Sequence, residues 1–237
     1  MYLRLVKIPF LLLVTALLVG GCSKNESSPT EPAAQTPTLP LVTFKGPNTT
    51  STDIHAQMAQ SYIQAMNAYT TAFTPYAGLP ATQTGNTWTW SYSVGTFTIT
   101  FTGTLQPDGS YQWKMVMNGL DPSDSTLYNN WTATTGTTSG DGKNGSWNIY
   151  DVNTTSLVAK YEWATSSNNV LTGTLTAYSN GTEVGKTVVV NNPDGSGELN
   201  EYTGTVLTYR SVWQANGSGQ WWTYDLSGTQ TGTGTWT

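Results

Sequence analysis

The chain has 237 residues, enough for one domain of good size with appendages. Charged residues make up only 10% of it, and the formal net charge is -5. Nucleic-acid binding needs clustered Lys and Arg to neutralise phosphates, whereas the basic residues here are scattered, so the composition argues against a nucleic-acid partner. Ten Trp, thirteen Tyr and 24 Gly indicate many aromatic side chains and many turns.

Residues 1–21 have the pattern of an export signal. Arg4 and Lys7 precede an apolar run from Ile8 to Val19, which is shorter than the roughly 20 residues needed to cross a bilayer. The run leads to Leu18-Val19-Gly20-Gly21-Cys22, which resembles the lipobox of bacterial lipoproteins. The resemblance implies cleavage before Cys22, acylation of this cysteine with fatty acids such as palmitate, and a lipid anchor in a membrane. An ordinary secretory signal with a chance cysteine is the alternative.

Residues 22–50 are rich in Ser, Thr, Pro, Asn and Glu and show no apolar periodicity, so we expect a disordered tether. Ser23 follows the cysteine at the position where Asp retains enterobacterial lipoproteins in the inner membrane. By that analogy we expect the bacterial outer membrane, on its periplasmic or cell-surface face. The cell membrane of a Gram-positive bacterium is the alternative.

Residues 51–80 are predicted to form an amphipathic helix and a connector. Ser51, Thr52 or Asp53 can cap the helix, and Pro75 ends it. Apolar residues recur three or four positions apart and define the predicted stripe, with alanines filling in: Ile54, Met58, Tyr62, Met66, Tyr69 and Phe73, with Ala56, Ala59, Ala65 and Ala68. The stripe must be buried, so the helix is expected either as a fixed part of the core or as a mobile lid over a cavity.

Residues 81–237 alternate between apolar and polar side chains and are punctuated by turns. In the segment 96–102 every second residue is threonine, which predicts a strand with one dry and one wet face. Turns are predicted at 107–109 and 193–195, both Pro-Asp-Gly, and at Asn180-Gly181. The fold class is therefore mainly β: a curled antiparallel up-and-down meander of ten or eleven strands, as a barrel or half-barrel, with the helix packed on it.

This predicted architecture resembles, by analogy of fold alone, the lipocalins and the unclosed barrels with helical lids that ferry lipoproteins. The resemblance implies an apolar ligand inside the curled sheet. Strands of alternating Thr and Phe are also typical of a membrane-spanning β-barrel, which is a further alternative.

Catalytic and metal-binding chemistry is restricted by the absence of suitable side chains. His55 is the only histidine and Cys22 the only cysteine, so no His or Cys zinc site can be assembled, and neither a metal nor a cofactor is expected. We expect His55 to be solvated. Glu162, Glu201 and Asp225 lie in predicted strands and are the candidates for the paired carboxylates of a glycoside hydrolase, although surface charges explain them as well.

Two groups of acidic and amide side chains suggest calcium, but neither has the EF-hand spacing, and a Pro-Asp-Gly hairpin explains the first as well. They are the segment 192–198 and the pair Asp121 and Asp124.

The aromatic residues suggest a binding surface at one position. Most Trp and Tyr are in phase with aliphatic residues and are predicted to be core. Trp221 and Trp222 are the exception, because neighbours in a strand face opposite ways, so one of them must lie on the wet face. They are the candidate ligand-binding residues, with an indole that could stack on a sugar ring.

The predicted function is a lipid-anchored envelope lipoprotein that is not an enzyme and that binds an apolar small molecule or a glycan. The alternatives are a structural or adhesive envelope protein without a ligand, and a glycan-active hydrolase that uses paired carboxylates.

Overall fold

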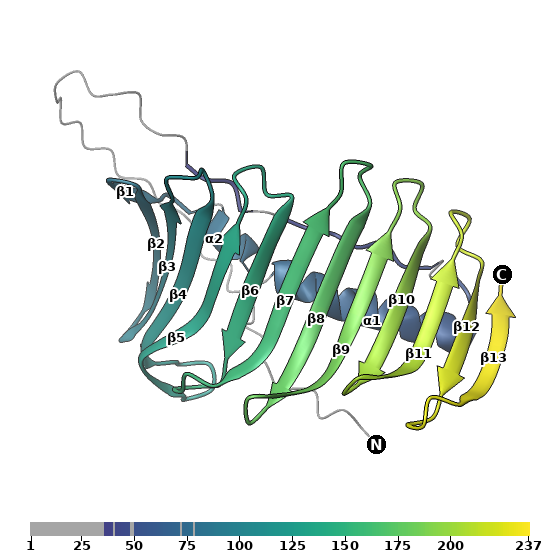
Figure 1. Ribbon diagram of the computed structural model, residues 1–237. Helices are drawn as coiled ribbons and strands as arrows, with labels where there is room; N and C mark the ends of the chain where they lie inside the picture. Colours follow the sequence, from purple (N-terminus) through teal and green to yellow (C-terminus); the bar gives the residue numbers. More distant parts are fainter. Residues whose placement is uncertain (1–35, 40, 48–49, 72, 78) are drawn as a thin grey trace. The chain divides into compact units, whose positions relative to one another are not determined.

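The computed structural model describes residues 36–39, 41–47, 50–71, 73–77 and 79–237, and residues 36–237 form one compact unit. The predicted signal peptide, Cys22 and the first part of the tether lie outside the described residues. The compact unit contains helix α1 (Ile54–Thr71), the short helix α2 (Thr74–Ala77) and one sheet of 13 strands (Figure 1).

Each strand of this sheet pairs antiparallel with the next one in the sequence. The strands are β1 (Thr82–Thr84), β2 (Thr87–Val94), β3 (Phe97–Leu105), β4 (Tyr111–Leu120), β5 (Leu127–Thr138), β6 (Asn144–Tyr150), β7 (Leu157–Thr165), β8 (Leu171–Ser179), β9 (Thr182–Asn191), β10 (Gly197–Thr203), β11 (Val206–Trp213), β12 (Gly219–Tyr224) and β13 (Gln230–Trp236). The predicted meander with a helix packed on it is confirmed.

The sheet is open, because β1 and β13 lie at its two edges and do not pair with each other. The half-barrel of the prediction is therefore closer to the structure than the closed barrel. The prediction of ten or eleven strands is two or three short. Strand β1 has only three residues, and β13 alternates Thr with Gly before Trp236, so neither carries the apolar alternation that identifies a strand.

The two faces of the sheet differ as the alternation of β3 predicts. Phe97, Ile99 and Phe101 are buried, whereas the threonines between them are half-exposed. We call the side that carries these buried residues the covered face, because α1 and the segment before it pack there. The opposite side is the open face. Figure 1 shows α1 running across the strands behind the sheet.

The predicted turns have the expected backbone conformations. Asn180 and Gly181 both have positive φ, 51° and 76°, which is the two-residue loop that follows the twist of a hairpin. Gly109 has φ of 81°, and its N–H donates to the carbonyl of Gln106 over 3.0 Å, which closes the Pro-Asp-Gly turn between β3 and β4.

Tryptophans on the covered face lie across glycines of the neighbouring strand. Their positions are exact cross-strand partners in five pairs: Gly103 with Trp113, Gly136 with Trp147, Gly145 with Trp163, Gly197 with Trp213, and Gly219 with Trp236. A Cβ added at any of these glycines would meet the partner's indole ring. The glycines therefore leave the space in which the indoles lie flat, an arrangement known to stabilise glycine in strands.

Helix α1 buries most of the predicted stripe. Asp53 caps the helix, because its Oδ1 accepts hydrogen bonds from the amides of His55 and Ala56 over 2.8 and 3.1 Å. The buried residues are Ala56, Ala59, Ile63, Met66 and Thr70, whereas Ile54, Ala65 and Ala68 are exposed. Met58, Tyr62 and Tyr69 of the predicted stripe are partly buried and pack against the core, so the prediction is wrong only for the three exposed residues.

An ordered segment before the helix lies on the same face of the sheet. We call residues 36–39 and 41–47 the strap. Leu39, Val42 and Phe44 of the strap are buried in the core. The prediction that the disordered tether extends to about residue 50 is therefore wrong for the strap, because alternate strap residues find apolar partners that composition alone does not reveal.

Two asparagines hold the strap by its backbone. Asn67 of α1 binds both the N–H and the C=O of Phe44, over 2.8 and 2.9 Å. Asn191 of β9 does the same for Lys45, over 2.6 and 2.9 Å. Each side-chain amide replaces a strand partner, so the buried strap leaves none of these backbone groups unpaired.

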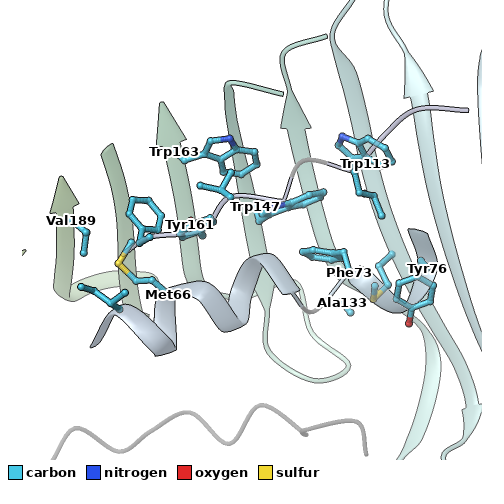
Figure 2. Close-up of a cluster of buried hydrophobic side chains, with 14 of the residues drawn as sticks. Met66, Phe73, Tyr76, Trp113, Ala133, Trp147, Tyr161, Trp163 and Val189 are labelled. Carbon is cyan, nitrogen blue, oxygen red and sulfur yellow. The ribbon is translucent and has the colours of Figure 1, made fainter. Parts of the chain in front are cut away.

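The covered face is filled by side chains of the sheet, the helices and the strap (Figure 2). Phe73 stacks on Trp147 and on Phe101, with ring centroids 4.3 and 5.6 Å apart. A Cβ at Gly173 would meet the ring of Phe44 and the end of the Met66 side chain. The strap and α1 therefore interlock with β8 at a glycine.

We expect Gly173→Ala to destabilise the protein by about 1–3 kcal/mol, because the new methyl group pushes Phe44 and the strap away from the sheet. Phe44→Ala removes a buried ring and should cost about 3 kcal/mol or more. In the double variant the methyl group occupies space that Phe44 has left, so the combined loss should be smaller than the sum of the two. Urea unfolding of the four proteins measures this coupling, and additive losses would contradict the interlock.

Candidate functional site

The two adjacent tryptophans of β12 lie on opposite faces of the sheet, as the sequence predicts. Trp221 packs against the covered core and stacks on His55 of α1, with ring centroids 3.5 Å apart. Trp222 lies on the open face, where the guanidinium of Arg210 sits over its ring at 5.0 Å from the centroid. Only Trp222 of the two candidate ligand-binding residues is therefore placed to meet a ligand on the open face.

His55 is not the solvated residue that we expected. It is half-buried and lies between α1 and the sheet, in the stack with Trp221 and also 6.1 Å from the ring of Tyr209. The hydroxyl of Tyr209 donates to the backbone carbonyl of His55 over 2.8 Å. These contacts fix the first turn of the helix on the sheet, which gives His55 a structural role.

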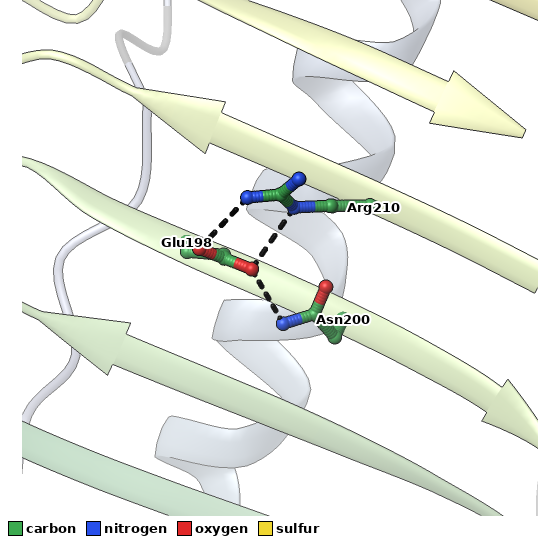
Figure 3. A network of polar contacts seen from close by, with 3 residues as sticks. All are labelled: Glu198, Asn200 and Arg210. Carbon is green, nitrogen blue, oxygen red and sulfur yellow. Dashed lines mark hydrogen bonds and ion pairs between the residues drawn. The ribbon is translucent and has the colours of Figure 1, made fainter. Parts of the chain in front are cut away.

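A polar network holds Arg210 beside Trp222. The Arg210 Nε and Nη2 atoms lie 3.0 and 3.3 Å from the two carboxylate oxygens of Glu198, and Asn200 donates to Glu198 over 2.8 Å (Figure 3). Burial opposes ionisation of Glu198, but the hydrogen bonds from Arg210 and Asn200 and the charge of Arg210 outweigh it and lower the pKa of this carboxyl. The network therefore stays charged at neutral pH and fixes the guanidinium in front of the indole.

Other cations of the open face are paired in the same way. Lys160 lies 2.7 Å from Glu162, and Lys186 lies 3.8 Å from Glu183. Lys186 also lies over the ring of Tyr202, 5.1 Å from its centroid. The region from β7 to β12 thus presents charges that compensate one another.

A short pattern recurs in β6, β8, β10 and β12 that our sequence reasoning did not find. Each of these strands contains Gly-x-(Trp or Leu)-x-x-Tyr, in the segments 145–150, 173–178, 197–202 and 219–224. Comparing the strands with one another, once the hairpins are aligned, would have revealed it. The pattern is hidden in the sequence because the copies are 22 to 28 residues apart and share only three residues.

The four tyrosines that end these patterns all belong to the open face. They are Tyr150, Tyr178, Tyr202 and Tyr224, and all are half-buried. Each follows a register shift in the pairing with the next strand. The tyrosines reach the open face by the alternation of their own strands, because the glycine and the Trp or Leu of each pattern face the covered side and the tyrosine has the opposite parity. The shift places the extra residue on the partner strand beside each tyrosine.

A shallow depression of about 540 Å³ lies at one end of the strands β5–β8, in the middle of the sheet. Its walls are mostly Ser and Thr, with Glu162 on the open face and Trp163 of the core below. The lining contains no second carboxylate, so the depression does not supply a pair of acids for hydrolysis.

The three candidate acids do not come together. Glu162 is on the open face, whereas Glu201 faces the covered core and accepts a hydrogen bond from Thr187. Asp225 is not in a strand but in the turn between β12 and β13, where it accepts from the amides of Ser227 and Thr229 over 2.9 Å. Carboxylates on opposite faces of one sheet cannot flank a single glycosidic bond.

The acidic clusters suggested for calcium form turns. Asp194 accepts from the amide and hydroxyl of Ser196 over 2.9 and 2.7 Å, and Asp121 accepts from Ser123 in the same way over 2.8 and 2.7 Å. Among the residues that the structure describes, no three His, Cys, Asp or Glu side chains are grouped to hold a metal ion. No helix in this part of the chain is long and apolar enough to cross a membrane.

Neither protein-family models nor curated proteins give a match to this chain. Its function is therefore argued from the geometry of the open face.

Glu201 generates a prediction for the pH dependence of stability. Burial under α1 raises the pKa of this carboxyl from 4.5 to about 7, and the hydrogen bond from Thr187 only partly opposes the shift. Between these two pH values the folded protein holds a proton that the unfolded chain releases, so the free energy of unfolding falls as pH rises and levels off above about 7. Between pH 4.5 and pH 7 the free energy of unfolding therefore falls by roughly 3 kcal/mol.

Glu201→Gln should remove most of this slope, because the amide does not ionise. Urea unfolding at pH 5 and pH 8 measures how the free energy of unfolding changes with pH. Ordinary carboxyls are mostly ionised over this range, so they contribute little to the change. Glu162→Gln, at an exposed acid, is the matched control and should keep the wild-type slope. Equal slopes for wild type and Glu201→Gln would show that Glu201 ionises freely in the folded protein.

Proposed function

We propose that this protein is a lipid-anchored, non-catalytic binding module of the bacterial cell envelope, which binds glycans on the open face of its sheet around Trp222. The anchor is the fatty-acylated Cys22, and the expected location is the outer membrane. The single observation that carries the glycan assignment is an indole held on a solvent-facing sheet surface by Arg210, with Glu198 and Asn200 beside it.

The chemistry of this surface fits a sugar. A pyranose ring has an apolar face of C–H groups that packs on an indole, and hydroxyl groups at its rim that both donate and accept hydrogen bonds. Arg210 and Asn200 supply donors, and Glu198 supplies an acceptor. The guanidinium lies over part of the half-exposed indole, so a sugar packs on the ring beside Arg210 rather than in its place. Since the guanidinium is fixed by the ion pair, the indole and the polar groups are already in place before a ligand arrives, which lowers the entropic cost of binding.

The covered face gives less support to the apolar ligand that was the other predicted class. Aromatic side chains of the sheet, Phe44 of the strap and Phe73 beside the helix fill it. Because interiors packed in this way hold few voids larger than a water molecule, a lipid-sized ligand would have to displace α1 and the strap. The two asparagine contacts that fasten the strap oppose that displacement.

Trp222→Ala should weaken glycan binding at least about tenfold, since an aromatic contact contributes about 1 kcal/mol beyond the surface area that it buries. Residues 23–237, the chain without the predicted signal and Cys22, are screened on an array of bacterial and plant polysaccharides. Binding to the best glycan is then measured by calorimetry. Trp222→Phe keeps an aromatic ring and is the matched control, and thermal unfolding verifies that both variants fold.

Two outcomes would contradict the glycan assignment: no binding to any polysaccharide by a folded protein, or equal affinity of wild type and Trp222→Ala. Either would favour a structural envelope protein, which the filled covered face also fits.

Cys22→Ser tests the anchor. In a Gram-negative host we expect the unchanged protein in the membrane fraction, labelled by radioactive palmitate and released by detergent. The serine variant cannot form the thioether to the lipid, so it should be unlabelled and found in the soluble or uncleaved fraction. Labelling of the serine variant, or an unlabelled wild type, would count against the lipobox.

A further inference from the structure

The row of tyrosines on the open face follows the two-strand repeat of the sheet. Tyr150, Tyr178, Tyr202 and Tyr224 lie on β6, β8, β10 and β12, so one strand separates each from the next. Adjacent strands are about 4.8 Å apart, which places successive tyrosines on the order of 10 Å from one another across the sheet. The row begins on β12, the strand of Trp222, and ends on β6, so it extends the aromatic surface across the sheet.

The row of tyrosines is offset along the strands at one place, between β8 and β10. Tyr150 and Tyr178 occupy equivalent positions, since Gly145 and Gly173 of their patterns are both paired with Trp163 of β7. Gly197 and Gly219 are likewise both paired with Trp213 of β11. Between β8 and β10 the register moves by two residues, because Gly173 is level with Leu199 through their common partner Val189. The four tyrosines therefore lie at two levels, Tyr150 with Tyr178 and Tyr202 with Tyr224, which are offset by two residues, roughly 7 Å, along the strands.

The charges around the row favour an uncharged ligand. Arg210, Lys186 and Lys160 each form an ion pair with a glutamate, so none is left to attract an anionic polymer. Much of the rest of the open face between these strands is Thr, Asn and Ser. This combination of aromatic rings, hydroxyl groups and compensated charge complements a neutral polymer of sugars.

We propose that the ligand is an extended, uncharged β-1,4-linked polysaccharide that crosses the strands from β6 to β12 and contacts one tyrosine at every second sugar. This inference rests on the proposed function, because it specifies the glycan bound at the Trp222 surface. In a β-1,4-linked chain each sugar is turned by half a rotation relative to the one before, so the same ring face returns with every disaccharide. The disaccharide length is close to two strand spacings, whereas an α-1,4-linked chain coils and loses this match.

The four tyrosines should not contribute equally. A sugar that stacks on Tyr202 has to displace the Lys186 ammonium from the ring, which costs the attraction between the cation and the ring. We therefore expect the smallest loss of affinity for Tyr202→Ala, and a loss of roughly fivefold for alanine at Tyr150, Tyr178 or Tyr224.

The test is calorimetry of residues 23–237 with β-1,4-linked oligomers of glucose and of N-acetylglucosamine, from the disaccharide to the octasaccharide. Maltose oligomers of equal length, which are α-1,4-linked, are the comparison ligands. Affinity for a β-1,4 series should rise with length up to about eight sugars, the length that spans all four rings at two strands per ring. Tyrosine to phenylalanine variants keep the rings and should keep the affinity, and each alanine variant is checked for unchanged thermal stability.

The outcomes separate this inference from the proposed function. The proposed function stands if glycans bind and Trp222→Ala weakens this binding. The extended-chain inference is nevertheless overturned if affinity does not grow with length, or if the tyrosine to alanine variants bind like wild type. Preference for the maltose series would overturn it as well. If no glycan of any length or linkage binds, both fail.

Discussion

The contact on which this structure depends is a tryptophan lying flat across a glycine of the neighbouring strand. A glycine in a strand interior is normally destabilising, because it has no side chain to pack and gains much freedom on unfolding. Here the missing Cβ is the space that the indole of the next strand occupies, as at Gly197 and Trp213. The pairing combines a glycine, which is poor for a strand by itself, with a tryptophan, which favours strands, into a well-packed unit.

These pairs also anchor the hairpins. The indole nitrogens of Trp163, Trp213 and Trp236 donate to the carbonyls of Gly142, Gly195 and Gly217 in the turns that precede their partner glycines, over 3.0, 3.2 and 2.7 Å. Each tryptophan therefore buries its ring on one hairpin and satisfies its polar atom at the turn of the same hairpin, as buried indoles require. Register is set locally, hairpin by hairpin, which allows a meander of 13 strands without crossovers.

The same arrangement determines which face remains for binding. Since the buried tryptophans and phenylalanines lie on one side, the two helices and the strap are sufficient to cover that side. The other side keeps the half-exposed threonines, the compensated ion pairs and the tyrosines that follow each register shift. A wide, neutral sheet surface with one tyrosine on every second strand is a by-product of the way in which the hairpins are built, and it suits an elongated ligand better than a small one.

Local pattern alone was sufficient for the meander, the predicted turns and the opposite orientation of Trp221 and Trp222, because a strand has a period of two and most of the hairpin turns contain a Gly. Other features depended on partners distant in the chain. The strap is ordered by its apolar contacts with the core together with the backbone contacts of Asn67 and Asn191, and Glu201 becomes buried only in the packed structure. The tyrosines form a row only once four hairpins are placed side by side. Burial and side-by-side placement are properties of the packed sheet, so these features became visible with the tertiary structure.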